Sequence, residues 1–311
     1  MHTQKEAPLV VEGAVKRYGD VQALAGASLS LQAGELVGLL GPNGAGKTTM
    51  INAIAGRLKL DAGAVRLFGR TLTREDKRPE LGVVPQEIAV YPLLTARENL
   101  EVFGRLYGVA TAELKGRVDW ALEWSDLTDR AREPTKKFSG GMKRRLNIAC
   151  GLVHAPAIVL LDEPTVGVDP QSRERIYEML DALRRAGVSI LLTTHHLEEA
   201  ERRCERIVII DHGRIVAAGT LQDLVGTTIG AARTLRITLG APLAASAPVP
   251  PGIIVDENRQ TMTAEVGDVG RDVGRLLASV AAAGGDVIDV ALGGATLQDV
   301  FISLTGRALR E

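Results

Sequence analysis

One segment restricts the fold of this chain more than any other, because residues 41–48 match the pattern G-x-x-x-x-G-K-[ST]. An apolar run at residues 36–40 precedes the segment, and residues 48–58 follow it with apolar side chains at helical spacing. A strand, a glycine-rich loop and a helix in this order predict a phosphate-binding loop, whose backbone N–H groups face anionic oxygens. The predicted contact residues are Gly41, Pro42, Asn43, Gly44, Ala45, Gly46, Lys47, Thr48 and Thr49.

Two side chains at the end of this loop suit the phosphates of a nucleotide. Lys47 supplies a mobile cation, and the hydroxyl group of Thr48 suits Mg²⁺, which bridges the β- and γ-phosphates. The ordinary alternative is a glycine-rich turn with a surface lysine. The match at every defined position, between a predicted strand and a predicted helix, favours the phosphate-binding loop.

Two adjacent carboxylates follow the apolar run at residues 158–161. At the carboxyl end of a parallel strand, Asp162 and Glu163 would lie at the sheet edge where ligands bind. Asp162 suits the Mg²⁺ shell, and Glu163 is the candidate to orient and deprotonate the attacking water. Taken alone, two acids before a proline would more often cap a helix, and the loop upstream reverses that preference. Together the two motifs indicate a nucleoside triphosphatase, and no Asn-Lys-x-Asp guanine-binding string occurs.

Five further positions narrow this class to one family. The string Phe-Ser-Gly-Gly-Met at residues 138–142 resembles the LSGGQ signature of ATP-binding cassette (ABC) proteins, and Tyr18, Gln86, Asp169 and His195 stand in that family's order. The resemblance covers about residues 8–225. It implies that Tyr18 stacks on adenine, that Gln86 senses Mg²⁺, and that His195 contacts the γ-phosphate. Alone, these three residues would be an exposed aromatic, a solvated loop residue and a sheet-edge histidine.

The signature suggests a second anion site. Ser139, Gly140 and Gly141 come before a predicted helix at residues 142–153, and a helix amino end attracts anions. Five basic residues lie near that end, where positive charge is unfavourable: Lys136, Lys137, Lys143, Arg144 and Arg145. They form either a solvated face or a site that binds a negatively charged partner. In ABC proteins the signature meets the γ-phosphate bound by the opposite subunit. The resemblance therefore implies a head-to-tail homodimer that holds two ATP molecules, with Asp169 in its D-loop.

Two strings, one that begins in the signature and one near the carboxyl end of the sequence, resemble one branch of the family. SGGMKRRLNIA from residue 139 and LQDVFISLTGR from residue 297 look like the bacterial drug-resistance and antibiotic exporters of the daunorubicin type. This resemblance implies an ATPase that powers export of a small molecule through a separate integral-membrane permease. The segment after Gln86, which contains Tyr91 and apolar neighbours, resembles the patch that receives the permease's coupling helix.

The order of predicted strands and helices indicates an α/β fold. We expect a RecA-like P-loop NTPase core with an antiparallel β-subdomain and a helical subdomain at about residues 88–153, all within residues 1–230, and a small C-terminal α+β domain at residues 231–311. In that domain we expect strands at 234–239, 261–266 and 286–291, and helices at 273–283 and from Leu297. It could be regulatory or stabilise a dimer. Sugar binding is disfavoured, because Phe301 is its one aromatic residue.

Charge, chain organisation and apolar content argue against other classes of protein. The formal net charge of −1, from 37 basic and 38 acidic residues, predicts no nucleic-acid partner. A soluble ABC ATPase of ribosomes or DNA usually carries two cassettes or a long coiled coil, and this sequence shows neither. The two cysteines, the lack of a signal segment and the short apolar runs predict a cytoplasmic location, peripheral on the inner face of the membrane through the permease.

Overall fold

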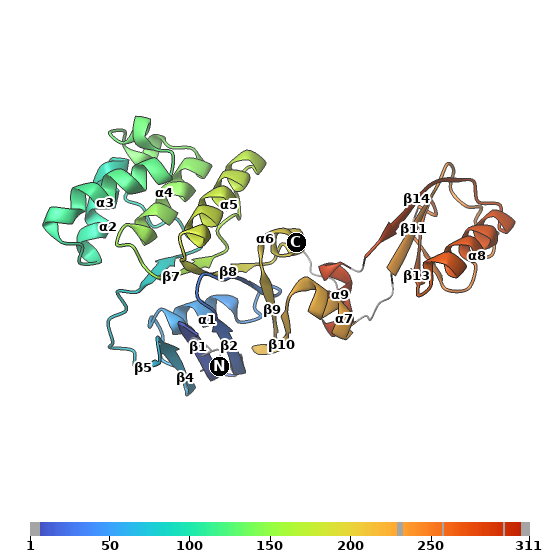
Figure 1. Cartoon of the computed structure of the whole chain (residues 1–311), viewed down its shortest axis with the longest axis horizontal. Coiled ribbons are helices and arrows are strands. Elements are labelled where there is room, and N and C mark those ends of the chain that lie inside the picture. The colour runs from blue at the N-terminus through green and yellow to red at the C-terminus, as the bar shows by residue number, and fades with distance from the viewer. Residues whose placement is uncertain (1–6, 229–232, 257, 295, 306–311) are drawn as a thin grey trace, which may run out of the picture. The chain divides into compact units, whose positions relative to one another are not determined.

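The computed structural model describes residues 7–228, 233–256, 258–294 and 296–305 (Figure 1). These residues form two compact units, of which the first ends at Thr220 and the second begins at Leu221. The sequence placed this division near residue 230. It falls earlier because the helix α7 (Leu221–Thr228) packs against α9 (Leu297–Thr305) of the second unit.

A six-stranded sheet with the order β10-β9-β3-β8-β7-β6 forms the centre of the first unit. All neighbouring pairs are parallel except β10 with β9. Because both faces of the sheet are covered, its central strands are continuous apolar runs rather than alternating ones. The strands are β3 (Leu36–Leu40), β6 (Leu81–Val84), β7 (Ile158–Asp162), β8 (Ser189–Thr194), β9 (Arg206–Asp211) and β10 (Arg214–Gly219).

An antiparallel sheet with the order β2-β1-β4-β5 lies across the helix α1 (Lys47–Ile54), and the two share one hydrophobic core with the central sheet. The helix α1 ends four residues before the limit expected from the sequence, since Gly56 adopts a left-handed φ of 73° that stops the helix. The strands of this sheet are β1 (Leu9–Tyr18), β2 (Val21–Leu31), β4 (Ala62–Leu67) and β5 (Arg70–Leu72).

Three helices form a separate hydrophobic core within the first unit, and Figure 1 shows them gathered together. They are α2 (Ala96–Leu106), α3 (Thr111–Trp124) and α4 (Gly140–Leu152), with short 3₁₀ turns at Thr128–Arg130 and Thr135–Lys137. Thr95 and Glu98 form a capping box that fixes the start of α2. The helices α5 (Pro170–Arg185) and α6 (Leu197–Arg203) pack against β8 of the central sheet.

The second unit has an antiparallel sheet with the order β12-β13-β11-β14 and one helix, α8, packed on it (Figure 1). Its strands are β11 (Arg233–Leu239), β12 (Ile253–Val255), β13 (Thr261–Val266) and β14 (Val287–Gly293). The sequence did not predict the short β12. The helix α8 (Val269–Ala282) begins before the expected residue 273, because Asp268 caps it by accepting from the Arg271 N–H at 3.2 Å.

Across all described residues, no helix combines the length and apolar character needed to cross a membrane.

Candidate functional site

The carboxyl ends of four parallel strands bring the predicted motifs to one edge of the central sheet. β3 leads into the loop at residues 41–48, and β6 leads to Gln86. β7 ends at Asp162, and β8 ends one residue before His195. Ligands of open α/β sheets bind at this edge.

The geometry of the glycine-rich loop explains why glycine stands at two of its positions. A Cβ atom on Gly41 would lie 2.3 Å from the carbonyl oxygen of Ile210, and one on Gly46 would lie 2.5 Å from that of Ala23. Gly46 also has a φ of 111°, which other residues rarely adopt. The loop can therefore approach the sheet only with glycine at these points.

Lys47 is buried at the base of this loop, with 5% of its surface exposed. Its Nζ atom donates to the carbonyl oxygens of Gly41 at 2.7 Å and Pro42 at 3.2 Å. Burial lowers the pKa of the ammonium group, and the nearby Glu163 and Asp162 carboxylates oppose that shift. The loop thus holds a partly desolvated cation in a fixed place.

The Glu163 side chain is 7% exposed and lies where several predicted residues meet. Its Oε1 atom is 3.4 Å from Nζ of Lys47 and 3.1 Å from Nδ1 of His195. Its Oε2 atom accepts a hydrogen bond from Nε2 of Gln86 at 3.1 Å. The residue also has a φ of 46°, a strained value for a side chain of this size. The structure therefore joins four residues that the sequence had assigned separately.

Thr193 belongs to this group, although the sequence did not single it out. Its hydroxyl donates to Oδ1 of Asp162 at 2.6 Å and accepts from the backbone N–H of Glu163 at 2.9 Å. Thr193 is paired with Asp162 in the register of β7 and β8. In the sequence, Thr193 is visible only as a polar residue near the end of an apolar run. The register that places it beside Asp162 cannot be read from the sequence.

A pocket of about 320 Å³ opens beside the loop. Tyr18 borders it and is 52% exposed, with Nζ of Lys16 5.6 Å from its ring centroid. The lining therefore combines an exposed aromatic ring with the loop and with Glu163, the acid that follows β7. Its residues are Tyr18, Val21, Ala23, Asn43, Gly44, Gly46, Lys47, Thr48, Thr49, Gln86 and Glu163.

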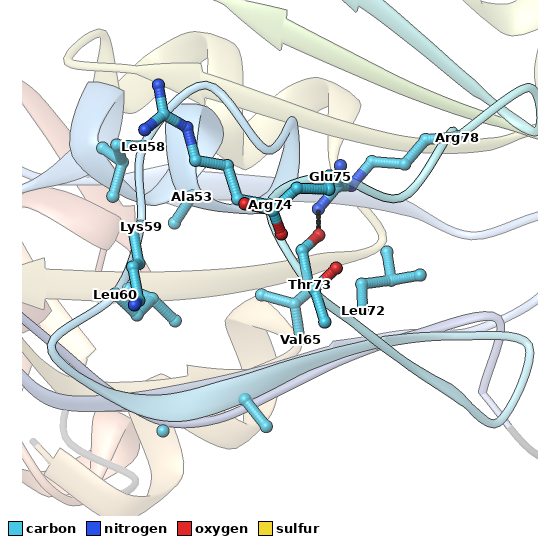
Figure 2. Close-up of a pocket in the computed structure, with 12 residues that line it drawn as sticks. Ala53, Leu58, Lys59, Leu60, Val65, Leu72, Thr73, Arg74, Glu75 and Arg78 are labelled. Atoms are coloured by element: carbon cyan, nitrogen blue, oxygen red, sulfur yellow. Dashed lines mark hydrogen bonds between the residues drawn. The ribbon is translucent and has the colours of Figure 1, made fainter.

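A pocket of similar volume, about 320 Å³, lies between α1 and the antiparallel sheet, and Figure 2 shows its lining. Basic residues border it, including Lys59, Arg74 and Arg78. The Arg78 guanidinium donates to the Thr73 carbonyl oxygen at 2.6 Å and to that of Asp76 at 2.8 Å. None of the predicted site residues borders this pocket, so chemistry rather than volume identifies the site.

The signature residues lie apart from the pocket of Lys47 and do not line it. Ser139 caps α4, since its hydroxyl accepts from the N–H of Met142 at 3.2 Å, and both Ser139 and Gly140 are exposed. Gly141 is buried, and a Cβ atom there would lie 2.1 Å from Oγ of Ser172. Gly141 therefore has a packing role against the start of α5.

Asp169 caps α5 at this contact. Its Oδ1 atom accepts from the N–H of Ser172 at 2.9 Å, and the hydrogen bonds to Ser172 lower the pKa of the carboxyl group. Asp169 itself is exposed, as Ser139 and Gly140 are. The signature and the start of α5 thus form one surface of the chain.

The structure corrects the sequence-based grouping of the basic residues near the signature. Arg144 is 3% exposed and binds backbone carbonyls, so it neither belongs to a solvated face nor faces an external anion. Arg145 donates to the backbone and carboxylate of Asp126. Lys136 and Lys137 are exposed, as a solvated face requires.

A phosphate-binding loop, paired acids at the end of β7 and a serine-capped signature helix define an ATPase of the cassette class. The sequence model of the "ABC transporter" family matches residues 24–166. The linearmycin resistance ATP-binding protein LnrL of Bacillus subtilis (strain 168) is 39% identical, with 97% of this chain and 100% of LnrL covered. The daunorubicin resistance ATP-binding protein DrrA3 of Streptomyces coeruleorubidus is 38% identical, with 97% and 96% covered. The chain belongs to the ABC transporter family, as an ATP-binding subunit.

Solved structures agree with this assignment. An ATP-binding subunit of an ABC transporter has a TM-score of 0.65 and 32% identity, with 71% of this chain and 93% of that chain covered. A dimeric ATP-binding cassette in a post-hydrolysis state, bound to ADP and Pi, has a TM-score of 0.61 and 28% identity, with 68% and 98% covered. This chain is accordingly a nucleotide-binding ATPase with the fold that the sequence predicted.

Proposed function

We propose that this ATPase works as a homodimer and powers the export of a small molecule, such as a drug or antibiotic, through a separate membrane permease. The proposal places the dimer on the cytoplasmic face of the membrane. Relatives named for linearmycin resistance and daunorubicin resistance, each matched over nearly the whole chain, support an exporter.

Nucleotide binding would use the pocket beside the glycine-rich loop. Backbone N–H groups of residues 41–48 and the amino end of α1 would bind the phosphates, with Lys47 as the cation. Tyr18 borders the same pocket and is half exposed, which suits stacking on the adenine ring.

The residues near Lys47 fit Mg²⁺ held jointly by protein and nucleotide. Among the described residues, no three His, Cys, Asp or Glu side chains are grouped so that they could hold a metal by themselves. Mg²⁺ prefers one or two carboxylates, with phosphate and water oxygens as the other ligands. Thr48, Gln86 and Asp162 would supply the protein ligands, and Thr193 orients the Asp162 carboxylate. When bound, Mg²⁺ neutralises charge on the phosphates.

The proposed mechanism rests on one observation: the Glu163 carboxylate is buried beside Lys47, Gln86 and His195. It would accept a proton from a water molecule as the water oxygen attacks the γ-phosphorus and the bond to the β-phosphate breaks. His195 and Gln86 fix the orientation of this carboxylate. His195 would also contact the γ-phosphate.

A second copy would complete the site. Ser139, Gly140 and Asp169 are exposed, and a Cβ atom on Gly140 would meet nothing within 4 Å. A helix amino end open to solvent is able to bind the γ-phosphate held by another chain. The dimeric cassette with ADP and Pi supports this arrangement.

The segment after Gln86 would receive the permease. Exposed apolar side chains gather there: Ile88 is 42% exposed, Tyr91 47% and Leu93 75%. Asn99 holds the backbone of this segment, since its Oδ1 atom accepts from the Tyr91 N–H at 2.7 Å. Such a patch beside Gln86 could transmit changes at the nucleotide to a membrane partner.

The proposal is tested by measuring ATP hydrolysis and Mg-ATP binding in Glu163→Gln, which keeps the shape of the side chain and removes the base. We expect kcat to fall by roughly 10²- to 10⁴-fold, while the dissociation constant for Mg-ATP changes little. Glu198→Gln, on the exposed face of α6, is the matched control and should keep wild-type kcat. Unchanged hydrolysis in Glu163→Gln would remove the proposed base.

A further inference from the structure

Arg144 makes an unusual set of contacts beside the candidate site. It lies in the second turn of α4, with 3% of its surface exposed. Its five N–H bonds match an equal number of acceptors. The acceptors are the backbone carbonyl oxygens of Pro85 (3.0 Å), Gln86 (2.7 Å), Asp162 (3.2 Å), Glu163 and Pro164 (2.7 Å).

These acceptors come from only two segments, and both carry residues of the site. One is the turn that presents Gln86 after β6, and the other is the end of β7, which presents the acids Asp162 and Glu163. The backbone of Glu163 is strained, with a φ of 46°. It is held on one side by the Thr193 hydroxyl at its N–H and on the other by Arg144 at its carbonyl. Removing either contact would free the backbone to relax.

Arg144 is a buried cation, and arginine suits this position better than lysine. Burial lowers the pKa of Arg144 to about 10, so the group stays protonated at neutral pH. Its planar group directs donors at both segments at once, whereas a lysine ammonium offers three donors from one point. The contacts therefore depend on the guanidinium shape as well as on the charge.

The helix α4 holds the Gln86 segment at a second point. Asn147, one turn beyond Arg144, is 3% exposed, and its Oδ1 atom accepts from the N–H of Ala89 at 3.0 Å. The signature serine, Ser139, caps the same helix. One helix thus connects the signature to both segments that carry the hydrolytic side chains.

We infer that Arg144 is a positioning residue for ATP hydrolysis, which fixes the backbone of Gln86 and Glu163 relative to the signature helix. This role rests on the proposed function of Glu163 as the base. Loss of the guanidinium would let the Glu163 carboxylate move away from its place beside Lys47. Hydrolysis should then suffer more than nucleotide binding, because every hydrogen bond of the described Arg144 side chain goes to the Gln86 and Glu163 segments and none goes to the phosphate-binding loop.

Arg144→Met tests this role, with Arg145→Met as a matched control. Arg145 follows Arg144 on the same helix and also donates to backbone carbonyls, but those belong to Ser125 and Asp126 within the helical region. We expect Arg144→Met to lower kcat by roughly 10- to 100-fold, with little change in the Mg-ATP dissociation constant. Arg145→Met should leave kcat near wild type. Equal kcat in the two folded variants would overturn the inference.

The same substitution made in the Glu163→Gln variant separates a positioning role from a general effect on the fold. In Glu163→Gln, where no base remains to be positioned, adding Arg144→Met should change the single-turnover rate by less than about twofold. An equal loss in both backgrounds would show that Arg144 acts on the fold alone. If Arg144→Met does not fold, Arg144→Lys replaces it, with the same split between kcat and binding expected. Loss of kcat in Glu163→Gln but not in the Arg144 variants would reject the positioning role and leave the proposed function standing.

Discussion

The pocket of Lys47 and the signature end of α4 differ in how the chain holds their functional groups. In the pocket, Lys47, Asp162 and Glu163 are at most 7% exposed and bonded to neighbouring groups. At the signature, Ser139 and Gly140 are exposed and do not line that pocket. The comparison shows that one chain organises the phosphate and acid side of the site by itself. It also supports the proposal that the signature side serves a partner.

Apart from Glu163→Gln, the largest effect is expected from Lys47→Ala, which removes the cation of the pocket. Loss of one preorganised donor should lower kcat by roughly 10²- to 10³-fold and also weaken ATP binding. Lys59→Ala, in the pocket of Figure 2, is the control and should hydrolyse ATP at the wild-type rate. Steady-state phosphate release measures both. A strong loss in Lys59→Ala would show that the wrong pocket was chosen.

Two adjacent glycines sharpen the comparison on the signature side. Gly141→Ala should destabilise the fold by about 1 to 3 kcal/mol, because the new Cβ atom would lie 2.1 Å from Oγ of Ser172. Gly140→Ala meets open space and sits in helix α4, so it should leave stability equal or raised by up to about 1 kcal/mol. Urea denaturation compares the two. Equal destabilisation of both variants would contradict the packing role of Gly141.

Tyr18→Ala should weaken ATP binding by about 1 to 3 kcal/mol, the usual range for a base stacked on an aromatic ring. Tyr91→Ala is the control, since Tyr91 is similarly exposed but lies in the segment proposed for the permease. Isothermal titration gives the dissociation constants. An unchanged value in Tyr18→Ala would make Tyr18 an ordinary exposed aromatic.

The smallest effect concerns pH. Burial lowers the pKa of Lys47 from its ordinary value of 10.5, and the protonated form binds phosphate. ATP affinity should be full below the lowered pKa and fall as pH rises through it, by at most about tenfold per pH unit. The contribution of Lys47 to folding stability should rise across the same pH window, because the lysine of the unfolded chain stays protonated to a higher pH. An ATP affinity that rises with pH in this window would contradict the prediction.

The sequence predicted the parts of the site that a single motif encodes and missed those that depend on spatial pairing. The loop at residues 41–48, the end of β7 and the central strands follow from local patterns. Thr193 joins the site through the register of β7 and β8, which one sequence does not reveal. Arg144 resembled the other basic residues near the signature, such as the exposed Lys136 and Lys137, and only the packing of α4 distinguishes it. The short strand β12 has too few residues to show alternation.

The central claim is that two chains share each site, and mixing two inactive variants tests it most directly. In a mixed dimer of Lys47→Ala and Ser139→Ala, both lesions fall on one site, so the other should be intact and ATP hydrolysis should reappear. In a mixed dimer of Lys47→Ala and Glu163→Gln, each site carries one lesion, and activity should stay low. Recovery in the first mixture alone is the predicted result. No recovery in the first mixture, with mixed dimers present by sedimentation, would contradict the shared site.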